Sequence, residues 1–451
     1  MEELDLREIA NDIAVLIDSK NNALIRNITV DLHPADIADI IHHLRDDDRD
    51  YMFGLLDAET ASDVLAELDD VSRDDLLEDL HHKRLSEIVD EMDSDDAADL
   101  VSDLPKDVAA KVLEQIDKQD SAEVRELLRH DEETAGGIMA KEFVSVSQNS
   151  TVDEAISAIR KKAEEVDDLY NIWVVDENSE LKGILPLKQL LLSKPDVRVA
   201  DIMDRDVMSV KTTMDQEQVV NIAKRYDLVS IPVVDEKNQL VGRITIDDLV
   251  DVMEEEASED IQRMAGISDE EEFRETSPWR IVRSRVPWLF LSFFGEMLSA
   301  IILKHYDASI SEITAAAFFI PIMMAIPGNV GIQSATIMVR GMATGEIAIY
   351  HVGRRLLREL LASLINGLIF GTLIFSVITF WLKTPKFGIM LAAILLININ
   401  TASLFGASIP FILKKMKIDP AIATGPFITT SNDALGLFVY LTMVTLFLKW
   451  L

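Results

Sequence analysis

The sequence predicts a multidomain membrane protein with an all-α superhelical (solenoid) N-terminal domain, an α/β tandem domain and a five-helix transmembrane domain. Three observations predict this fold class: a helical repeat of 12 residues, a second repeat in which strands and helices alternate, and five long apolar segments after residue 279. The 451-residue chain also divides by charge. Residues 279–451 carry 14 Lys and Arg and 7 Asp and Glu, while residues 1–278 carry the other 29 basic and 72 acidic residues.

This composition excludes several classes of protein. An acidic N-terminal region repels phosphate, so we expect no nucleic-acid partner. The chain has no Cys, which excludes disulfide-stapled scaffolds, cysteine nucleophiles and thiolate metal sites. The first twenty residues are acidic and amphipathic and lack the basic n-region and apolar core of a secretory signal. We therefore expect no signal peptide and a cytoplasmic N-terminus.

Residues 1–130 are expected to form the acidic helical N domain. Apolar residues recur every 12 positions in two registers over eight periods, and capping residues open each period. Paired short helices of about 24 residues that stack side by side form an α-solenoid. The first register is Leu32, Leu44, Leu56, Leu68, Leu80, Met92, Leu104 and Ile116, and the second is Ile40, Met52, Val64, Leu76, Ile88, Leu100, Val112 and Val124.

Residues 131–253 contain an α/β repeat. FVSVSQNSTVDEAISAI (143–159) recurs at 207–223, and IWVVDENSELKGILPLKQL (172–190) recurs at 231–249. Each copy predicts strand, helix, strand, turn, strand and helix. This pattern resembles a tandem pair of CBS domains, at about 137–200 and 201–253. In such domains a Thr-x-x-Asp near the last helix often holds a nucleotide ribose; Thr245 and Asp248 fit in the second copy, whereas Pro186–Gln189 in the first does not. The alternatives are a site for ATP or another adenine nucleotide and a purely structural dimer scaffold.

An acidic helix is predicted over 247–266, leading into a connecting segment at 254–278. Asp248, Asp251, Glu255 and Glu259 follow one another at helical spacing and share one face. A solvated acidic face is one interpretation. A hard divalent cation is the other, because Mg²⁺ prefers carboxylate and water oxygens. Candidate partner acids in the N domain are Asp93, Asp95, Asp96 and Asp99.

Residues 279–451 form the transmembrane domain. The predicted spans are Val286–Leu303, Thr314–Val339, Leu356–Leu382, Phe387–Leu413 and Ala421–Leu448. With the N-terminus inside, ten Lys and Arg fall on inner segments and four on outer segments. The positive-inside rule thus favours a multi-pass protein of the cell membrane with cytoplasmic N-terminal domains and its C-terminus outside.

Polar residues mark the second and fifth spans. The second contains Pro321, Pro327-Gly328-Asn329 and Gln333, and we expect non-helical backbone there, lining a cavity or pore. A kinked helix that packs through small residues is the alternative. The fifth contains Thr429 and Asp433, and intramembrane acids usually mark ion pathways.

Glu296 in the first span fits packing and function equally well. Five spans are few to enclose a pathway, and a homodimer with the second and fifth spans on its axis would solve this.

The order of these parts resembles the MgtE family of magnesium channels and transporters over almost the whole chain. The specific matches are PGNVGIQSAT in span two and TTSNDALG in span five. The resemblance implies a Mg²⁺-selective homodimer that imports Mg²⁺ down its electrochemical gradient, is not an enzyme and closes when cytosolic Mg²⁺ bridges the soluble domains. It implies a pore site at Asp433 and Asn329, with Gly328, Gln333 and Thr429 nearby. The implied regulatory metal ligands are Asp95, Asp96, Asp99, Asp227, Asp248, Asp251, Glu256, Glu259 and Asp260.

Three other functions fit parts of the sequence. Oxygen ligands favour Mg²⁺ without excluding transport of another divalent cation such as Co²⁺. A membrane sensor regulated by its CBS pair would transport nothing, and the polar second and fifth spans argue against it. An enzyme is disfavoured because His42-His43 and His81-His82 lie in solenoid helices without a nucleophile or base nearby in the pattern.

Overall fold

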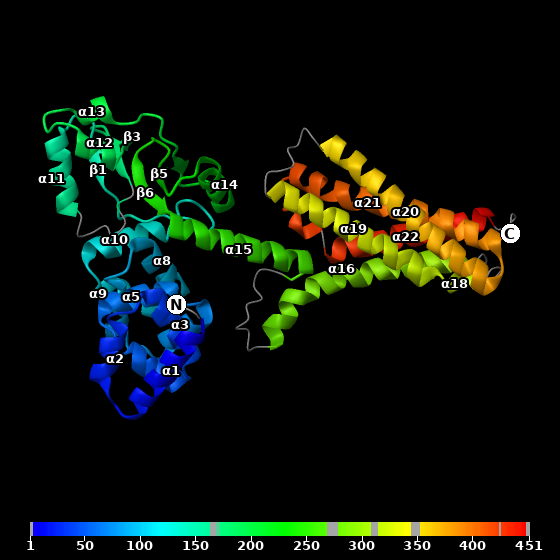
Figure 1. The fold of residues 1–451 in the computed structure, drawn as a ribbon, viewed down its shortest axis with the longest axis horizontal. Coiled ribbons are helices and arrows are strands. Elements are labelled where there is room, and N and C mark those ends of the chain that lie inside the picture. Colours follow the sequence, from blue (N-terminus) through cyan, green and yellow to red (C-terminus); the bar gives the residue numbers. More distant parts are fainter. Residues whose placement is uncertain are drawn as a thin grey trace. The chain divides into compact units, whose positions relative to one another are not determined.

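The structure is a computed structural model that describes residues 3–162, 169, 171–267, 278–307, 314–343, 352–423 and 425–447 (Figure 1). The chain divides into two compact units, residues 1–255 and 256–451, and each is described by itself.

The N domain is a run of short helices that begin at regular intervals. From residue 34 onwards a helix begins every 12 residues, as the sequence repeat predicts. The helices are α1 (Glu3–Asp18), α2 (Asn22–Thr29), α3 (Pro34–His43), α4 (Asp46–Phe53), α5 (Ala58–Glu67), α6 (Asp70–Asp79), α7 (His82–Val89), α8 (Ser94–Asp103), α9 (Lys106–Gln115) and α10 (Lys118–Leu127).

Helices two apart in sequence pack together, so the structural repeat is about 24 residues. α3 packs on α5, α5 on α7, α7 on α9, and α8 on α10. Ile40, Val64, Ile88 and Val112 stand 24 residues apart, and each is fully buried. The core of the solenoid is therefore the second apolar register of the sequence, and the predicted solenoid is confirmed.

Two similar three-stranded sheets follow. In the first, β1 (Ser145–Ser147) pairs parallel to β2 (Ile172–Val175), which pairs antiparallel to β3 (Leu181–Leu185). β4 (Val210–Lys211), β5 (Ser230–Val234) and β6 (Leu240–Thr245) repeat this order. The accompanying helices are α11 (Val152–Lys162), α12 (Leu187–Leu192), α13 (Val199–Ile202) and α14 (Gln216–Tyr226). The order of elements in each copy agrees with the sequence prediction.

The two copies join at their hairpin turns. The Leu181 amide donates to the Asn238 carbonyl oxygen, and the Leu240 amide donates to the Ser179 carbonyl oxygen, both at 2.9 Å. Ser179 and Asn238 have φ values of 61° and 62°. These equivalent bonds relate the two copies by an approximate two-fold symmetry.

A single helix, α15 (Ile246–Ala265), starts at the end of β6 and includes the predicted acidic helix. The second α/β repeat and the connecting segment thus share one helix. Residues 268–277 of the connecting segment lie outside the described residues.

The membrane unit contains five helices long and apolar enough to span a bilayer. The predicted five-helix domain is confirmed in outline. The elements are α16 (Pro278–His305), the short α18 (Thr314–Ala317), α19 (Ile320–Ala343), α20 (Val352–Leu382), α21 (Pro385–Lys415), the 3-10 turn η2 (Ala421–Ala423) and α22 (Pro426–Phe447).

Helix α21 is the centre of this bundle. It packs against α19, α20 and α22, which run beside it in Figure 1. α16 packs against α22 and leaves most of its apolar surface exposed. The core includes Ile394, Leu395 and Leu441, all fully buried.

The predicted non-helical backbone at Pro327-Gly328 is wrong. α19 is helical throughout this segment, and span two is interrupted earlier, at the turn of residues 318–319. Pro327 lacks the N–H that would bond to the carbonyl of Met323, four residues before it. The side-chain amide of Asn398 on α21 reaches that carbonyl oxygen at 3.5 Å. A neighbouring helix thus supplies a substitute donor, as membrane helices often do at proline.

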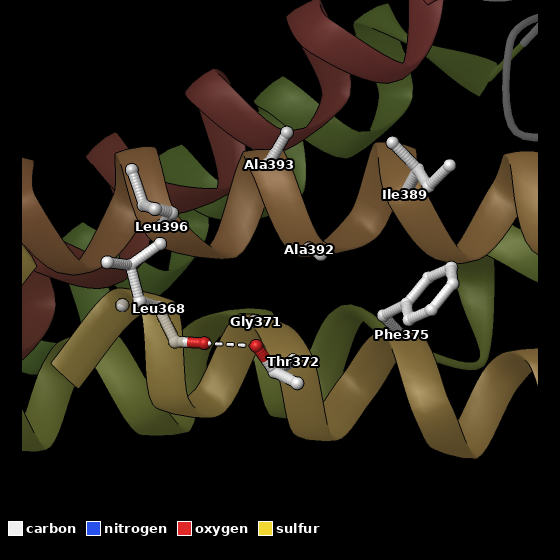
Figure 2. Close-up of a pocket in the computed structure, with 9 residues that line it drawn as sticks. Leu368, Gly371, Thr372, Phe375, Ile389, Ala392, Ala393 and Leu396 are labelled. Atoms are coloured by element: carbon white, nitrogen blue, oxygen red, sulfur yellow. Dashed lines mark hydrogen bonds between the residues drawn. The ribbon is translucent and has the colours of Figure 1, made fainter. Parts of the chain in front are cut away.

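An open groove of about 270 Å³ lies between α20 and α21 (Figure 2). Gly367, Gly371 and Ala392 let the helices approach, while Leu368, Phe375, Ile389 and Leu396 form the walls. The Thr372 hydroxyl donates to the Leu368 carbonyl of its own helix. The lining therefore suits hydrocarbon and offers no carboxylate to a cation.

Candidate functional site

Asp433 lies where three membrane helices meet. It is half-buried on α22, and its carboxyl group forms a hydrogen bond with Glu296 of α16. A Cβ placed on Gly328 of α19 would lie 3.8 Å from the Asp433 carboxylate oxygen Oδ1. Gly328 thus lies directly beside this carboxylate, and two acids from different helices share one place in the bundle.

The residues beside Asp433 are fixed by close packing. Asn432 is 4% exposed, and neither its side-chain oxygen nor its nitrogen has a hydrogen-bond partner in the described part of the chain. It packs against Gly331 of α19, where any side chain would overlap it. Thr429 is half-buried and its hydroxyl donates to the Gly425 carbonyl oxygen at 3.3 Å. Position 433 therefore sits on a rigid part of α22.

Asn329 and Gln333 lie on a different face of α19 from its packed side. Both are exposed in the single chain, as are Ala325 and Ile337, so residues four apart form one open stripe. Gly328 is buried beside Asp433. The structure brings Gly328 to Asp433 but leaves Asn329 and Gln333 on an unfilled surface of the subunit.

In the soluble unit, acids of α8 face acids of α15. The Asp95 and Asp96 carboxylates interact with Asp248, and Asp99 interacts with Glu255. The start of α8 is held by Glu142, which accepts hydrogen bonds from the Ser94 amide and hydroxyl. Asp248 in turn accepts from the Thr245 amide and hydroxyl at 2.8 and 2.7 Å. Both rows of acids are therefore held in place by local capping bonds.

Burial, together with the neighbouring acids, raises the pKa values of these carboxyl groups. Desolvation and the nearby Asp248 raise the pKa of Asp95 well above its usual range and that of Asp96 to about 8. Desolvation, with Glu132, raises the pKa of Asp99 to about 7 against the opposing effect of Arg73. Desolvation raises the pKa of Asp248 to about 6, although the Thr245 hydrogen bonds oppose it. Asp96 and Asp99 keep exposed edges, so water reduces the energetic consequence of these shifts.

Two other predicted metal ligands, Asp251 and Asp227, do not belong to the facing acids of α8 and α15 described above. Desolvation raises the pKa of Asp251, and Glu67 of the N domain adds to the effect. Asp227 has an exposed side chain at the left-handed end of α14, with φ of 53°, and none of the interactions above involves it. The left-handed conformation gives position 227 a structural reason for Asp, which tolerates it better than most residues.

The C-terminal half of α15 meets the start of span five. Arg263 forms ion pairs with Glu259 of its own helix and with Asp419, the latter at 2.7 Å. Desolvation raises the pKa of Asp260, and Asp419 and Glu256 add to it. Glu256, Glu259 and Asp260 thus gather near Asp419.

The donor set of both clusters suits a hard cation. Within the described residues, however, His, Asp and Glu side chains form no group of three or more placed to hold a metal ion. The carboxylates approach one another without converging on a point. Their oxygen-only chemistry fits Mg²⁺, which keeps several waters and commonly uses one or two carboxylates.

Thr245 and Asp248 bond to each other as a cap of α15, so the Asp248 oxygen Oδ2 is already occupied. The candidate nucleotide residues and the acidic cluster therefore share one carboxylate.

The sequence pattern gives Glu296 no preferred role, and Asp419 and Glu359 are not among the site residues predicted from it. Asp419 precedes Pro420 just before span five, and Glu359 lies among hydrophobic residues of span three. An acid within or beside a span was the available signal for each.

Comparison with known protein families matches three parts of the chain. Residues 320–443 match the MgtE divalent cation transporter domain, residues 32–133 match the MgtE intracellular N domain, and residues 135–194 and 199–255 match CBS domains.

Two curated relatives are similar over most of their length. The magnesium transporter MgtE of Thermus thermophilus is 35% identical over 72% of this chain and 73% of its own length. The magnesium transporter MgtE of Enterococcus faecalis is also 35% identical, over 73% of this chain and 72% of its own length.

Two solved structures resemble the soluble part. The soluble part of a magnesium transporter is 29% identical, with a TM-score of 0.52, and aligns over 56% of this chain and 99% of its own. The cytosolic domain of the Mg²⁺ channel MgtE in complex with ATP is 34% identical, with a TM-score of 0.51, and aligns over 54% of this chain and 99% of its own.

Proposed function

The chain belongs to the MgtE family of magnesium transporters, which are not enzymes, and we propose that it is a Mg²⁺-selective channel or transporter that closes when cytosolic Mg²⁺ is abundant. The observation that carries the proposal is the position of Asp433, an acid that lies beside Gly328 and Glu296 where three spans meet. We further propose that residues 1–130, 131–253 and 254–278 act as N domain, CBS pair and connecting helix of the gate.

The pore chemistry follows from the hydration of Mg²⁺. The ion loses its inner waters slowly, so a pore recognises the hydrated ion through carboxylate, amide and carbonyl oxygens. Asp433 supplies a charge, while Asn329 and Gln333 supply amide oxygens along one stripe of α19. Thr429 lies one turn before Asp433 on the same helix.

A homodimer is the assembly that best uses this surface. Exposed amides on a membrane helix are costly unless water or another subunit covers them. Two copies of α19 facing a two-fold axis would place their polar stripes along one wet path. The negative membrane potential would then drive import, since two charges crossing 100 mV release about 4.6 kcal/mol.

Gating is proposed to use the facing acids of α8 and α15. Asp95, Asp96, Asp99, Asp248 and Asp251 repel one another when no cation is present. Mg²⁺ bound among them, and among Glu256, Glu259 and Asp260, would favour a compact closed arrangement. A ligand shifts such an equilibrium only by its preference for one state, and several weak sites sum. Asp227, exposed at the end of α14, is a further proposed ligand.

The topology completes the proposal. Cytoplasmic N-terminal domains place the acidic sensor on the side that accumulates Mg²⁺, and the positive-inside count puts the C-terminus outside. The structure of a relative in complex with ATP supports a nucleotide role for the CBS pair, at Thr245 and Asp248.

The decisive experiment is ion flux in proteoliposomes with Mg²⁺ varied separately on each side. We expect inward flux at low internal Mg²⁺, shut-off at high internal Mg²⁺, and loss of flux in Asp433→Asn, because the amide keeps the size but removes the charge. The control is Asp307→Asn, which neutralises an exposed acid at the end of span one and should keep normal flux.

Each alternative gives its own result. If the unaltered chain shows no flux, the non-transporting sensor is favoured. If Co²⁺ and Mg²⁺ in competition cross at equal rates, the proposed selectivity for Mg²⁺ is rejected. Normal flux in Asp433→Asn would reject Asp433 as the pore acid.

A further inference from the structure

Glu359 is a largely buried acid in the membrane unit that the proposed function does not use. Its side chain is only 12% exposed, on α20, the helix that follows α19 in the chain. Arg355, one turn earlier on the same helix, donates to its oxygen Oε1 at 2.7 Å. The ion pair with Arg355 uses the oxygen Oε1 and leaves the second oxygen, Oε2, available to accept another bond.

That second oxygen accepts a hydrogen bond from α19. The Ser334 hydroxyl donates to Glu359 Oε2 at 3.1 Å, and Ser334 also lies 2.9 Å from the Ser403 hydroxyl on α21. A serine has one hydroxyl proton. Because the Ser334 hydroxyl donates its one hydrogen bond to Glu359, the Ser403 hydroxyl is the donor in its bond with Ser334. One directed chain therefore joins α21, α19 and α20.

The two serines in this chain of bonds are shielded from water. Ser334 is 4% exposed and Ser403 is 1% exposed. Bonds to a charged acceptor are stronger than neutral ones. A nearby bond between Ser363 of α20 and Asn400 of α21, at 2.9 Å, strengthens the same helix contact. The inner polar part of the α20–α21 contact thus differs from its small-residue part at Gly367 and Gly371, where the groove of Figure 2 opens.

Ser334 is placed to control the orientation of α19. It follows Gln333 directly, and successive helical residues point about 100° apart. Val330, Ser334 and Met338 form the buried stripe of α19, whereas Asn329, Gln333 and Ile337 form the open stripe. Holding Ser334 toward Glu359 therefore holds Gln333 toward the open side.

We propose that Glu359, held by Arg355, is a positioning residue for transport, whose bond to Ser334 fixes the rotation of α19 and so the direction of Asn329 and Gln333. The inference rests on the proposed ion path along α19. Glu359 does not touch the ion in this scheme and acts only through Ser334.

The test uses the absence of cysteine from the 451-residue sequence. A Gln333→Cys reporter is reconstituted in liposomes, and its rate of modification by a charged, water-soluble thiol reagent is measured with and without Glu359→Ala. We expect modification in the parent and a decrease of about three- to twenty-fold with Glu359→Ala, the range given by hydrogen bonds between membrane helices. Glu359→Gln should restore part of the rate, because its side-chain oxygen still accepts from Ser334.

Three controls separate positioning from general damage. A Lys415→Cys reporter at the end of α21 should keep its rate in Glu359→Ala. Ser376→Ala removes a hydroxyl of α20 that donates to the Thr372 carbonyl of the same helix, and should not change the Gln333→Cys rate. Ser334→Ala should reduce the rate as Glu359→Ala does, and the double variant should add little, since both remove one bond.

Mg²⁺ flux gives the second readout. With native Gln333, Glu359→Ala should raise the half-saturating Mg²⁺ concentration at equal amounts of inserted protein. An unchanged reporter rate with lower protein yield would overturn the proposal, as would an unmodified reporter in the parent. If the unaltered chain carries no flux but the reporter still depends on Glu359, the transport function fails and the positioning role stands. If flux is normal but the modification rate of the Gln333→Cys reporter does not change with Glu359→Ala, only the positioning role is rejected.

Discussion

The acids of α8 and α15 are residues whose proton affinity is set by their neighbours. Asp95, Asp96 and Asp99 face Asp248 and Glu255, and the pKa values of the first four are raised. Each carboxylate is stabilised by a proton or by a cation that replaces it. Proton binding and Mg²⁺ binding should therefore compete at this contact.

The raised pKa values predict how stability changes with pH. Folding raises these pKa values, so the folded chain binds more protons than the unfolded chain above pH 4, and the stability gained from them is lost as pH rises through about 6 to 8. In Mg²⁺-free buffer we expect the melting temperature of the soluble region to fall across this window, by about 2–4 °C for each kcal/mol lost.

The double variant Asp96→Asn, Asp99→Asn controls for histidine titration in the same window. It should flatten the profile, and millimolar Mg²⁺ should flatten it in the parent. A melting temperature that rises from pH 6 to 8 would contradict the assignment.

At single residues, the sequence indicated which side chains were functional candidates, but it did not indicate which side chains they contact. Asp433 was predictable because an acid within a span is costly and usually serves an ion or proton pathway. Its contact with Glu296 was not, because the pairing depends on how α16 packs against α22, which hydrophobic pattern does not encode. Asp419 escaped notice for the same reason: its meaning comes from Arg263, which is 156 residues away in sequence.

The crossing of α19 and α21 depends on two glycines. A Cβ on Gly406 would overlap the Gly331 carbonyl oxygen, and Gly331 in turn leaves room for Asn432. Helices in lipid gain stability largely from such close contact, since lipid tails are as apolar as leucine. The position of Asp433 therefore depends on a contact one helix away.

Gly406→Ala tests this contact. The added methyl group must push α19 and α21 apart, and we expect a loss of about 1–3 kcal/mol in the free energy of unfolding, typical of overpacking. Thermal unfolding in detergent with the same lipid content measures it. Gly353→Ala is the matched control, since a Cβ there meets nothing within 4 Å. Equal stability of the two variants would argue against tight packing at this crossing.

Elements with a strong local period were predictable from sequence. The starts of α3 to α10 follow the 12-residue repeat because each short helix needs one cap and one buried stripe. Pro327 led to a wrong prediction, because the carbonyl it leaves unbonded is reached by Asn398 of another helix. The local sequence shows that Pro327 removes a backbone hydrogen bond, but it does not show that Asn398 supplies another donor.

The whole molecule separates charge from apolar surface. Residues 1–278 hold 72 acidic residues against 29 basic ones, while five apolar helices follow. Without counterions the soluble domains repel themselves, and bound divalent cations reduce that repulsion more than monovalent salt does.

Scattering should register this difference. The fragment of residues 1–267 is expected to have a smaller radius of gyration in millimolar Mg²⁺ than in Na⁺ of equal ionic strength, because bridging adds to screening. Asp95→Asn with Asp248→Asn should reduce the contraction, and Lys237→Ala at an exposed turn should not. An identical radius in both salts would refute sensing by compaction.

The placement of α16 has a consequence for biosynthesis. The first of the five described spans to be translated packs against the fifth, α22, and only 6% of an apolar 18-residue stretch within it is buried. Until α22 (Pro426–Phe447) has been translated, α16 has mainly lipid as its neighbour. Glu296 of α16 then lacks its contact with Asp433 of α22. Assembly of the proposed ion path therefore requires α22, and a nascent chain truncated before α22 would lack the proposed path.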